Sequence, residues 1–145
     1  MIALIQRVSR ASVSTGGREL GEIGRGTLAL IGVSRDDDRA AADRLLERVL
    51  AYRIFPDDEG RMNRSLQAIG GGLLLVPQFT LAADTHKGTR AGFSTAATPE
   101  VARDLFGYLL ERAITGHSPV ACGEFGADMQ VELVNDGPVT FWLEA

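Results

Sequence analysis

The stretch Thr27–Val33, TLALIGV, is an unbroken apolar run in the first third of the chain. At this length it is typical of a strand that is buried on both faces of a sheet. A second run of the same kind, Leu73–Val76 (LLLV), follows the triple glycine at residues 70–72. Each run predicts a buried strand.

The residues before the first run predict a β-meander. Ile2–Val8 has the composition of a strand, and two further strand-like segments, Ala11–Thr15 and Glu19–Ile23, flank Gly16-Gly17. A pair of glycines between such segments is a hairpin signal, because glycine adopts the positive φ angles that tight turns need.

A helix is predicted to follow, from about Asp38 to Ile54. Leu45 and Leu46 precede Val49 and Leu50 by four positions each, so they form one apolar stripe at helical spacing. The acidic run that ends at Asp38 is interpreted as a helix start rather than a metal site, because acidic residues favour the first turn. Pro56 and the polar residues 57–60 then end the helix.

A long loop and a second helix come next. Residues 82–97 show no periodicity, and loops of this length in compact domains are usually functional or mobile. Thr98 is a suitable cap and Pro99 suits the first helical position. The predicted buried face of this helix carries three apolar residues, Val101, Leu105 and Leu109.

The last third returns to strands, predicted near residues 120–125, Met129–Val134 and Val139–Leu143, with a turn at 135–138. The chain is therefore expected to be one mixed α/β domain over residues 1–145. It would be strand-rich, with meander or barrel-like sheets and two main helices. Its length suits a single core.

Composition narrows the class of protein. Apolar residues make up 45% and charged residues 23%, as in soluble globular proteins. The net charge of −4 argues against a protein that coats nucleic acid nonspecifically, so we expect no DNA partner. The single cysteine, Cys122, fits a reducing cytosol. No apolar run approaches the roughly 20 residues of a membrane span, and the N-terminus resembles a strand rather than a signal peptide. We therefore expect a cytoplasmic protein without a membrane partner.

Standard catalytic machinery is scarce in this sequence. The two histidines, His86 and His117, both lie in predicted loops and outside any nucleophile motif, and the histidines and the one cysteine are too scattered for a zinc site. The remaining candidate is Gln78 and Thr80, which directly follow a buried strand in PQFTL. The residues alone leave open whether this is a functional strand end or a strand that runs out into solvent.

Three separated motifs give the chain a resemblance to the D-aminoacyl-tRNA deacylase family. They are MIALIQRVSRASV at residues 1–13, PQFTLAAD at 77–84, and ADMQVELVNDGPVTFWLE at 127–144, and the resemblance covers essentially the whole chain. It implies a hydrolase that cleaves the ester of D-aminoacyl-tRNA and removes glycine from mischarged tRNA-Ala. It also implies a homodimer that works without metal or cofactor on the acceptor end of the tRNA.

The resemblance also implies roles for particular residues. Gly137-Pro138 would form a cis peptide that reaches into the partner's site beside Gln78, Phe79 and Thr80. Its two carbonyls would reject an L side chain and admit a D-amino acid or glycine. Backbone N–H groups near Phe79 would stabilise the oxyanion, and Thr80 would position rather than attack.

Supporting positions follow in the same way. Arg7 resembles the arginine that braces the Gly-Pro loop, and Phe125 and Met129 match positions that line a pocket for the terminal adenosine. Plain core packing is the alternative for the last two.

One departure leaves alternatives open. The family usually has Ser before Gln-Phe-Thr, whereas this chain has Pro77. Pro-Gln at this point is similar to a related branch that clears L-alanine from threonine tRNA and has a trans Gly-Pro bond. The complete NDGPVTFW ending and Phe79 favour the D-specific branch and a cis bond. A non-catalytic protein that binds the acceptor end is a further alternative.

Overall fold

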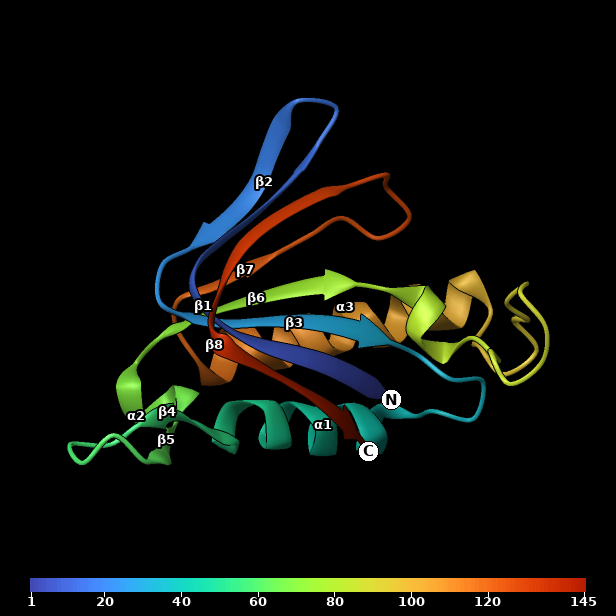
Figure 1. Ribbon diagram of the computed structural model, residues 1–145. Coiled ribbons are helices and arrows are strands. Elements are labelled where there is room, and N and C mark those ends of the chain that lie inside the picture. The colour runs from blue at the N-terminus through green and yellow to red at the C-terminus, as the bar shows by residue number, and fades with distance from the viewer.

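The buried run at residues 27–33 lies at the centre of a six-stranded sheet in the computed structural model, which describes residues 1–145 (Figure 1). Strand β3 pairs antiparallel with β1 and parallel with β6, so both of its edges are occupied. The strand order is β2-β1-β3-β6-β7, and β8 pairs with β1. The strands of this sheet are β1 (Ile2–Thr15), β2 (Arg18–Ile23), β3 (Gly26–Gly32), β6 (Gly72–Pro77), β7 (Val120–Cys122) and β8 (Gln130–Glu144).

The sheet curls into a nearly closed barrel because β1 is long and changes partner along its length. Its first half pairs with β3 and its second half with β2, while β8 runs along both halves. Strand β2 then reaches β7, where a Cβ atom on Gly21 would lie 2.9 Å from that of Ala121. Seven apolar residues fill the interior, among them Val8, Leu28 and Val76.

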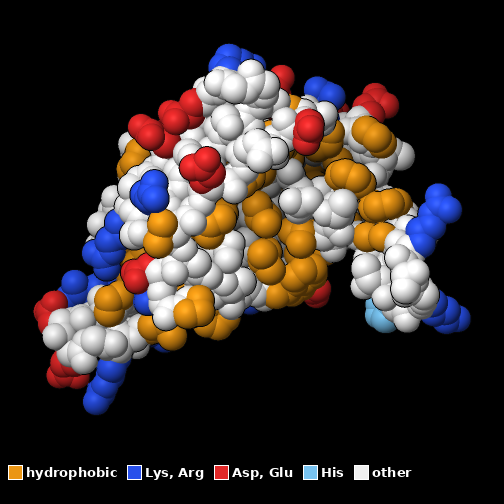
Figure 2. All heavy atoms as spheres, turned by 45° about the horizontal axis from the view of Figure 1, so that its top comes forward, with side chains coloured by type: hydrophobic (Ala, Val, Ile, Leu, Met, Phe, Trp, Pro, Cys, Tyr) orange, Lys and Arg blue, Asp and Glu red, His pale blue; other side chains and the backbone are white.

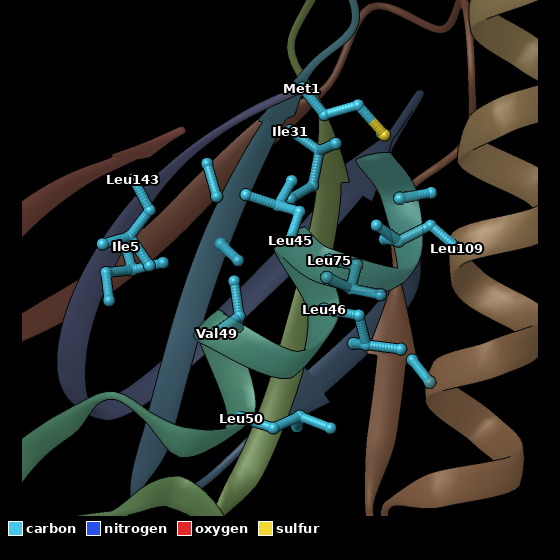
Figure 3. Packing of buried hydrophobic residues seen from close by; sticks show 14 of the residues in the cluster. Met1, Ile5, Ile31, Leu45, Leu46, Val49, Leu50, Leu75, Leu109 and Leu143 are labelled. Atoms are coloured by element: carbon cyan, nitrogen blue, oxygen red, sulfur yellow. The ribbon is translucent and has the colours of Figure 1, made fainter. Parts of the chain in front are cut away.

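Two main helices cover the outer face of the sheet. Helix α1 (Arg39–Ala51) begins at Asp38, whose carboxylate accepts from the N–H of Ala41. Helix α3 (Pro99–Gly116) begins at Thr98, with Pro99 at its first position. Their apolar faces and the sheet form a core of 23 buried residues, which includes the predicted stripe 45/46/49/50 (Figure 3). The predicted fold class, caps and hairpin are confirmed.

The predicted end of the first helix was wrong by three residues. The chain leaves α1 at Ala51 and forms a small hairpin of β4 (Arg53–Pro56) and β5 (Met62–Ser65), followed by the single-turn helix α2 (Leu66–Ile69). Ile54 and Phe55 are buried as strand residues. A β-branched residue, an aromatic residue and a proline in succession favour this extended conformation.

Other corrections concern element boundaries. The two strands expected at 2–8 and 11–15 are one strand, β1, and those expected at 129–134 and 139–143 are one strand, β8. Because each is the other's partner, the pairing continues through segments that look like turns in the sequence. Val101 was assigned to the buried face of α3, but it is 41% exposed and Ala102 takes that place.

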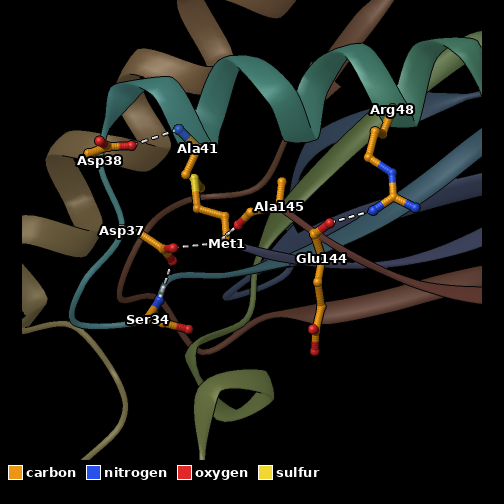
Figure 4. Close-up of polar contacts among 8 residues, drawn as sticks. All are labelled: Met1, Ser34, Asp37, Asp38, Ala41, Arg48, Glu144 and Ala145. Carbon is orange, nitrogen blue, oxygen red and sulfur yellow. Dashed lines mark hydrogen bonds and ion pairs between the residues drawn. The ribbon is translucent and has the colours of Figure 1, made fainter.

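The two chain ends meet beneath α1 (Figure 4). The Met1 ammonium group donates to Asp37 Oδ1 at 2.5 Å and to the carbonyl of Ala145 at 2.6 Å. Asp37 also accepts from the N–H of Ser34, and Arg48 donates to the carbonyl of Glu144. None of the helices is both long and apolar enough to cross a lipid bilayer.

Candidate functional site

The first part of the candidate site is the end of β6. The strand stops at Pro77, and residues Phe79–Ala82 form a tight 3₁₀ turn, η1, rather than an extended strand end. The backbone N–H of Gln78 donates to the carbonyl of Ile31 at 2.7 Å, which fixes the start of this turn to β3. The Gln78 amide donates to Thr80 Oγ1 at 2.5 Å, so the two predicted polar residues hold each other in place.

This turn leaves two backbone donors free. Phe79 and Thr80 are the first two residues of η1, and the first N–H groups of a helix have no acceptor within it. Neither N–H group donates to a carbonyl in a turn, loop or cap. Both residues are exposed. Two adjacent free N–H groups can stabilise negative charge on a reacting oxygen.

A cavity of about 440 Å³ opens beside the turn. Four predicted residues line it together, namely Gln78, Phe79, Phe125 and Met129. Its lining is mostly apolar, which suits an aromatic base or an apolar side chain. The complete lining is Val76, Pro77, Gln78, Phe79, Ala97, Pro99, Ala102, Phe125, Gly126, Ala127, Met129 and Val131.

The two predicted pocket residues are held by neighbours. The Phe125 ring lies 5.1 Å from the guanidinium of Arg103 and 6.5 Å from the ring of Phe106. The sulfur of Met129 accepts from the N–H of Glu124 at 3.4 Å. No local sequence signal identifies Arg103, because its place over Phe125 depends on how α3 packs beside the last third of the chain.

The second part of the candidate site is a bulge in β8. Gln6 pairs with Thr140 and Val8 with Asn135, so the four residues 136–139 lie opposite Arg7 alone. The Gly137-Pro138 peptide bond within this bulge is cis, as is Ser118-Pro119. Both Gly137 and Pro138 are exposed. The predicted turn at 135–138 is thus a bulge inside a continuous strand.

Two side chains brace the bulge. Arg7, whose side chain is only 13% exposed, donates to the carbonyl of Asp136 at 2.9 Å and to that of Ile54 at 2.8 Å. Asn135 accepts from the N–H of Val139 at 3.0 Å and donates to Thr140 Oγ1 at 3.0 Å. The guanidinium therefore ties the bulge to the chain at the start of β4.

Glycine is required at position 137. Its φ angle is +142°, and a Cβ atom there would lie 2.6 Å from Val139 Cγ2 and 2.9 Å from the Val139 backbone nitrogen. Residues other than glycine almost never adopt this backbone conformation. The bulge therefore presents bare main chain to the solvent.

The two parts do not meet within one chain. Arg7, opposite the bulge, pairs with Thr27, which pairs with Leu73 near the start of β6. Pro77 ends that strand four residues further on, about 13 Å away along the strand direction. Strands β1 and β3 also lie between β8 and β6.

Pro77 fits its place without loss of a ladder hydrogen bond. It pairs with Ile31 at the end of β6, where the next residue donates to β3. On the other edge, β7 ends at Cys122, opposite Leu75, so no strand faces Pro77 there. Its missing N–H therefore has no acceptor to lose.

Acid–base groups are sparse around the cavity. The His86 ring is 90% exposed and lies 2.7 Å from the carboxylate of Asp84. The pKa of Asp84 is lowered, first by a hydrogen bond from the backbone N–H of His86 and then by the ring. His117 contacts the carbonyl of Gly71 at 2.7 Å. No group of three or more His, Cys, Asp or Glu residues is arranged to hold a metal ion.

Comparison with known proteins identifies the family of this chain. The family model described as D-Tyr-tRNA(Tyr) deacylase matches residues 4–144. The D-aminoacyl-tRNA deacylase of Alkalilimnicola ehrlichii is 65% identical over all of this chain and 97% of its own length. That of Stutzerimonas stutzeri is 59% identical over the full length of both chains.

Two solved structures share the fold. One, titled c-Myc DNA Unwinding Element Binding Protein, superposes with a TM-score of 0.95 at 37% identity over 100% of this chain and 99% of its own. The other, a probable eukaryotic D-amino acid tRNA deacylase, has a TM-score of 0.82 at 17% identity, over 99% and 98% of the two chains. With a family model that spans nearly every residue and relatives this similar over their whole length, the chain belongs to the D-Tyr-tRNA(Tyr) deacylase family.

Proposed function

We propose that this protein hydrolyses the ester of D-aminoacyl-tRNA, and of glycine mischarged on tRNA-Ala, and spares L-aminoacyl-tRNA. The observation that carries the proposal is the apolar cavity beside the free N–H groups of Phe79 and Thr80. The names of the full-length relatives support the substrate class. Because aminoacyl-tRNA is the substrate, we expect the enzyme to act in the cytoplasm.

The chemistry needs little from side chains. Water attacks the ester carbonyl, the carbon–oxygen bond to the ribose breaks, and the ribose oxygen leaves with a proton. The N–H groups of Phe79 and Thr80 stabilise the oxyanion that forms in between. Gln78 holds the Thr80 hydroxyl, which gives Thr80 a positioning role. The terminal adenosine occupies the cavity between Phe125 and Met129, and its 2′-hydroxyl assists the proton transfer.

The selectivity step is proposed to use two copies of the chain. Gly137 and Pro138 are exposed and lie at the far end of the sheet from the turn of their own chain. A homodimer that brings this bulge to the partner's turn would place two main-chain carbonyls against the substrate's α-carbon. An L side chain would collide with them, whereas a D side chain or a glycine would not.

An assay of the purified protein on four substrates tests the proposal, namely D-Tyr-, L-Tyr-, Gly- and L-Ala-tRNA. Release of D-Tyr and Gly, with L-Tyr-tRNA left intact, is the expected result. Rapid cleavage of L-Ala-tRNA with little action on D-Tyr-tRNA would move the protein to the branch that Pro77 resembles. Binding of the acceptor end with no cleavage of any substrate would make it a non-catalytic tRNA binder.

A mixing experiment tests the cross-subunit site separately. Thr80→Ala and Gly137→Ala variants are each expected to be nearly inactive as homodimers. If the site combines the turn of one chain with the bulge of the other, a mixed dimer regains one intact site. No regain of activity, after subunit exchange has been verified by mass spectrometry, would contradict the shared site.

A further inference from the structure

The segment between η1 and α3, residues 83–98, projects from the body as a separate lobe. Figure 2 shows it at the right edge, with Lys or Arg side chains and a histidine, and with a hollow between it and the body. Its base is fixed, because Thr95 Oγ1 donates to the carbonyl of Ala82 at 2.6 Å and Ala97 donates to Val33 at 3.0 Å. Asp84 and Gly92 then pair with each other across the lobe.

The lobe is cationic on an acidic protein. Between Ala82 and Thr98 it carries Lys87 and Arg90 against one carboxylate, Asp84, while the whole chain has a net charge of −4. Asp84 is engaged by His86. Neither Lys87 nor Arg90 forms an ion pair, and both are exposed. Two unpaired cations on a projection are well placed to meet phosphates.

An exposed aromatic pair connects the lobe to the cavity. Phe93 of the lobe and Phe79 of the turn have ring centroids 5.2 Å apart and planes tilted by 39°. They are 46% and 58% exposed, whereas Phe55 and Phe106 are buried. Phe79 also lines the cavity. Proteins that bind single-stranded nucleic acid combine exposed rings, on which bases stack, with cations that meet the phosphates, and this lobe carries both.

We propose that the lobe binds the single-stranded end of the tRNA just upstream of the terminal adenosine. A base stacks on Phe93, and Lys87 and Arg90 contact the phosphates that follow. This proposal rests on the proposed function, because it assumes that the adenosine lies in the cavity. It assigns substrate-binding roles to three residues of a loop that takes no part in the chemical step.

The kinetic test compares Phe93→Ala, Lys87→Gln and Arg90→Gln with the wild type on D-Tyr-tRNA. Phe93→Ala is expected to raise KM about 5- to 150-fold, the range for loss of one stacked base. Each charge removal should reduce the slope of log KM against the logarithm of the salt concentration by about 0.7. Most of the change should lie in KM, and the penalty should shrink on D-tyrosyl-adenosine, which lacks the upstream nucleotides.

The matched control is Arg61→Gln, which removes an exposed cation from the β4–β5 hairpin at the opposite end of the molecule (Figure 1). It should leave KM and its salt dependence unchanged. If all three lobe variants match the wild type, the lobe proposal is wrong even though the enzyme is active. An inactive wild type would instead contradict the proposed function, so the two failures are distinguishable.

A binding readout independent of activity uses the fact that Lys87 is the only lysine in the chain. The Met1 ammonium group is buried against Asp37, so an amine-acetylating reagent should modify Lys87 first. Saturating deacylated tRNA should slow this modification severalfold, as measured by mass spectrometry. Unchanged labelling would contradict the proposal, as would a Phe93→Ala variant that alters dimer dissociation rather than tRNA binding, since Phe93 would then pack against a second copy of the chain.

Discussion

The Gly137→Ala substitution tests the bulge most directly. The added methyl group would lie 2.6 Å from Val139 Cγ2 and 2.9 Å from the Val139 nitrogen. The side-chain contact can be relieved by rotation at Val139, but the backbone contact and the φ of +142° cannot. Holding an L-residue in such a region costs about 1–3 kcal/mol. With the steric contact included, we expect about 2–4 kcal/mol to act on the bulge.

The bulge is expected to move rather than the whole fold to unfold. The bulge is exposed. The charged guanidinium of Arg7 donates one hydrogen bond to it, at the Asp136 carbonyl. Such a bond contributes about 1.5–3 kcal/mol, which is similar to the strain. The carbonyls therefore shift, and kcat/KM on D-Tyr-tRNA should fall roughly 30- to 1000-fold. The melting temperature should fall by no more than about 10 °C.

Two further variants make the reasoning refutable. Gly107→Ala on α3 adds the same methyl group in open space at a helical φ, so it should be neutral or stabilising by up to about 1 kcal/mol. The double variant Gly137→Ala/Val139→Ala removes the side-chain contact alone and should restore activity only in part. Full activity in Gly137→Ala, or full rescue in the double variant, would refute the claim that backbone geometry demands glycine.

Three other predictions follow from contacts outside the site. The Thr27 hydroxyl is buried without a hydrogen-bond partner, so Thr27→Val should raise the free energy of unfolding by about 1 kcal/mol in urea titrations. Asp37→Asn leaves the buried Met1 ammonium group without its counter-charge and should cost about 3–5 kcal/mol, whereas Asp38→Asn keeps a good helix cap and should be nearly neutral. Burial raises the pKa of the Cys122 thiol, so iodoacetamide should label the native protein at pH 7.5 much more slowly than the urea-unfolded chain.

The sequence predicted those features that depend on local signals. The apolar run at 27–33, the stripe on α1 and the caps at Asp38 and Thr98 all appear as expected. These signals lie within a few residues of one another, so no knowledge of distant contacts is needed. The fold class follows from them, since buried strands and two amphipathic helices have few ways to pack.

The features that the sequence did not predict depend on pairing between distant segments. Nothing near Asn135 distinguishes a turn between two strands from a bulge within one, because the difference lies in β1, which continues on the other side. The place of Arg103 over Phe125 likewise depends on tertiary packing. The pocket residues Phe125 and Met129 were selected by family resemblance alone, and the structure brings them to one cavity with Gln78 and Phe79.

The sheet register gives a physical reason for the proposed two-chain site. A selectivity filter made of main chain needs carbonyls that no side chain covers, and it needs them fixed. The bulge meets both needs, because glycine leaves the backbone bare and Arg7 and Asn135 hold it. It also has to lie in β8 opposite Arg7, at the level of Leu73 and far from the turn that follows Pro77. One chain therefore holds the bulge and the turn about 13 Å apart along the sheet, and the proposed filter needs a second copy of the chain to bring them together.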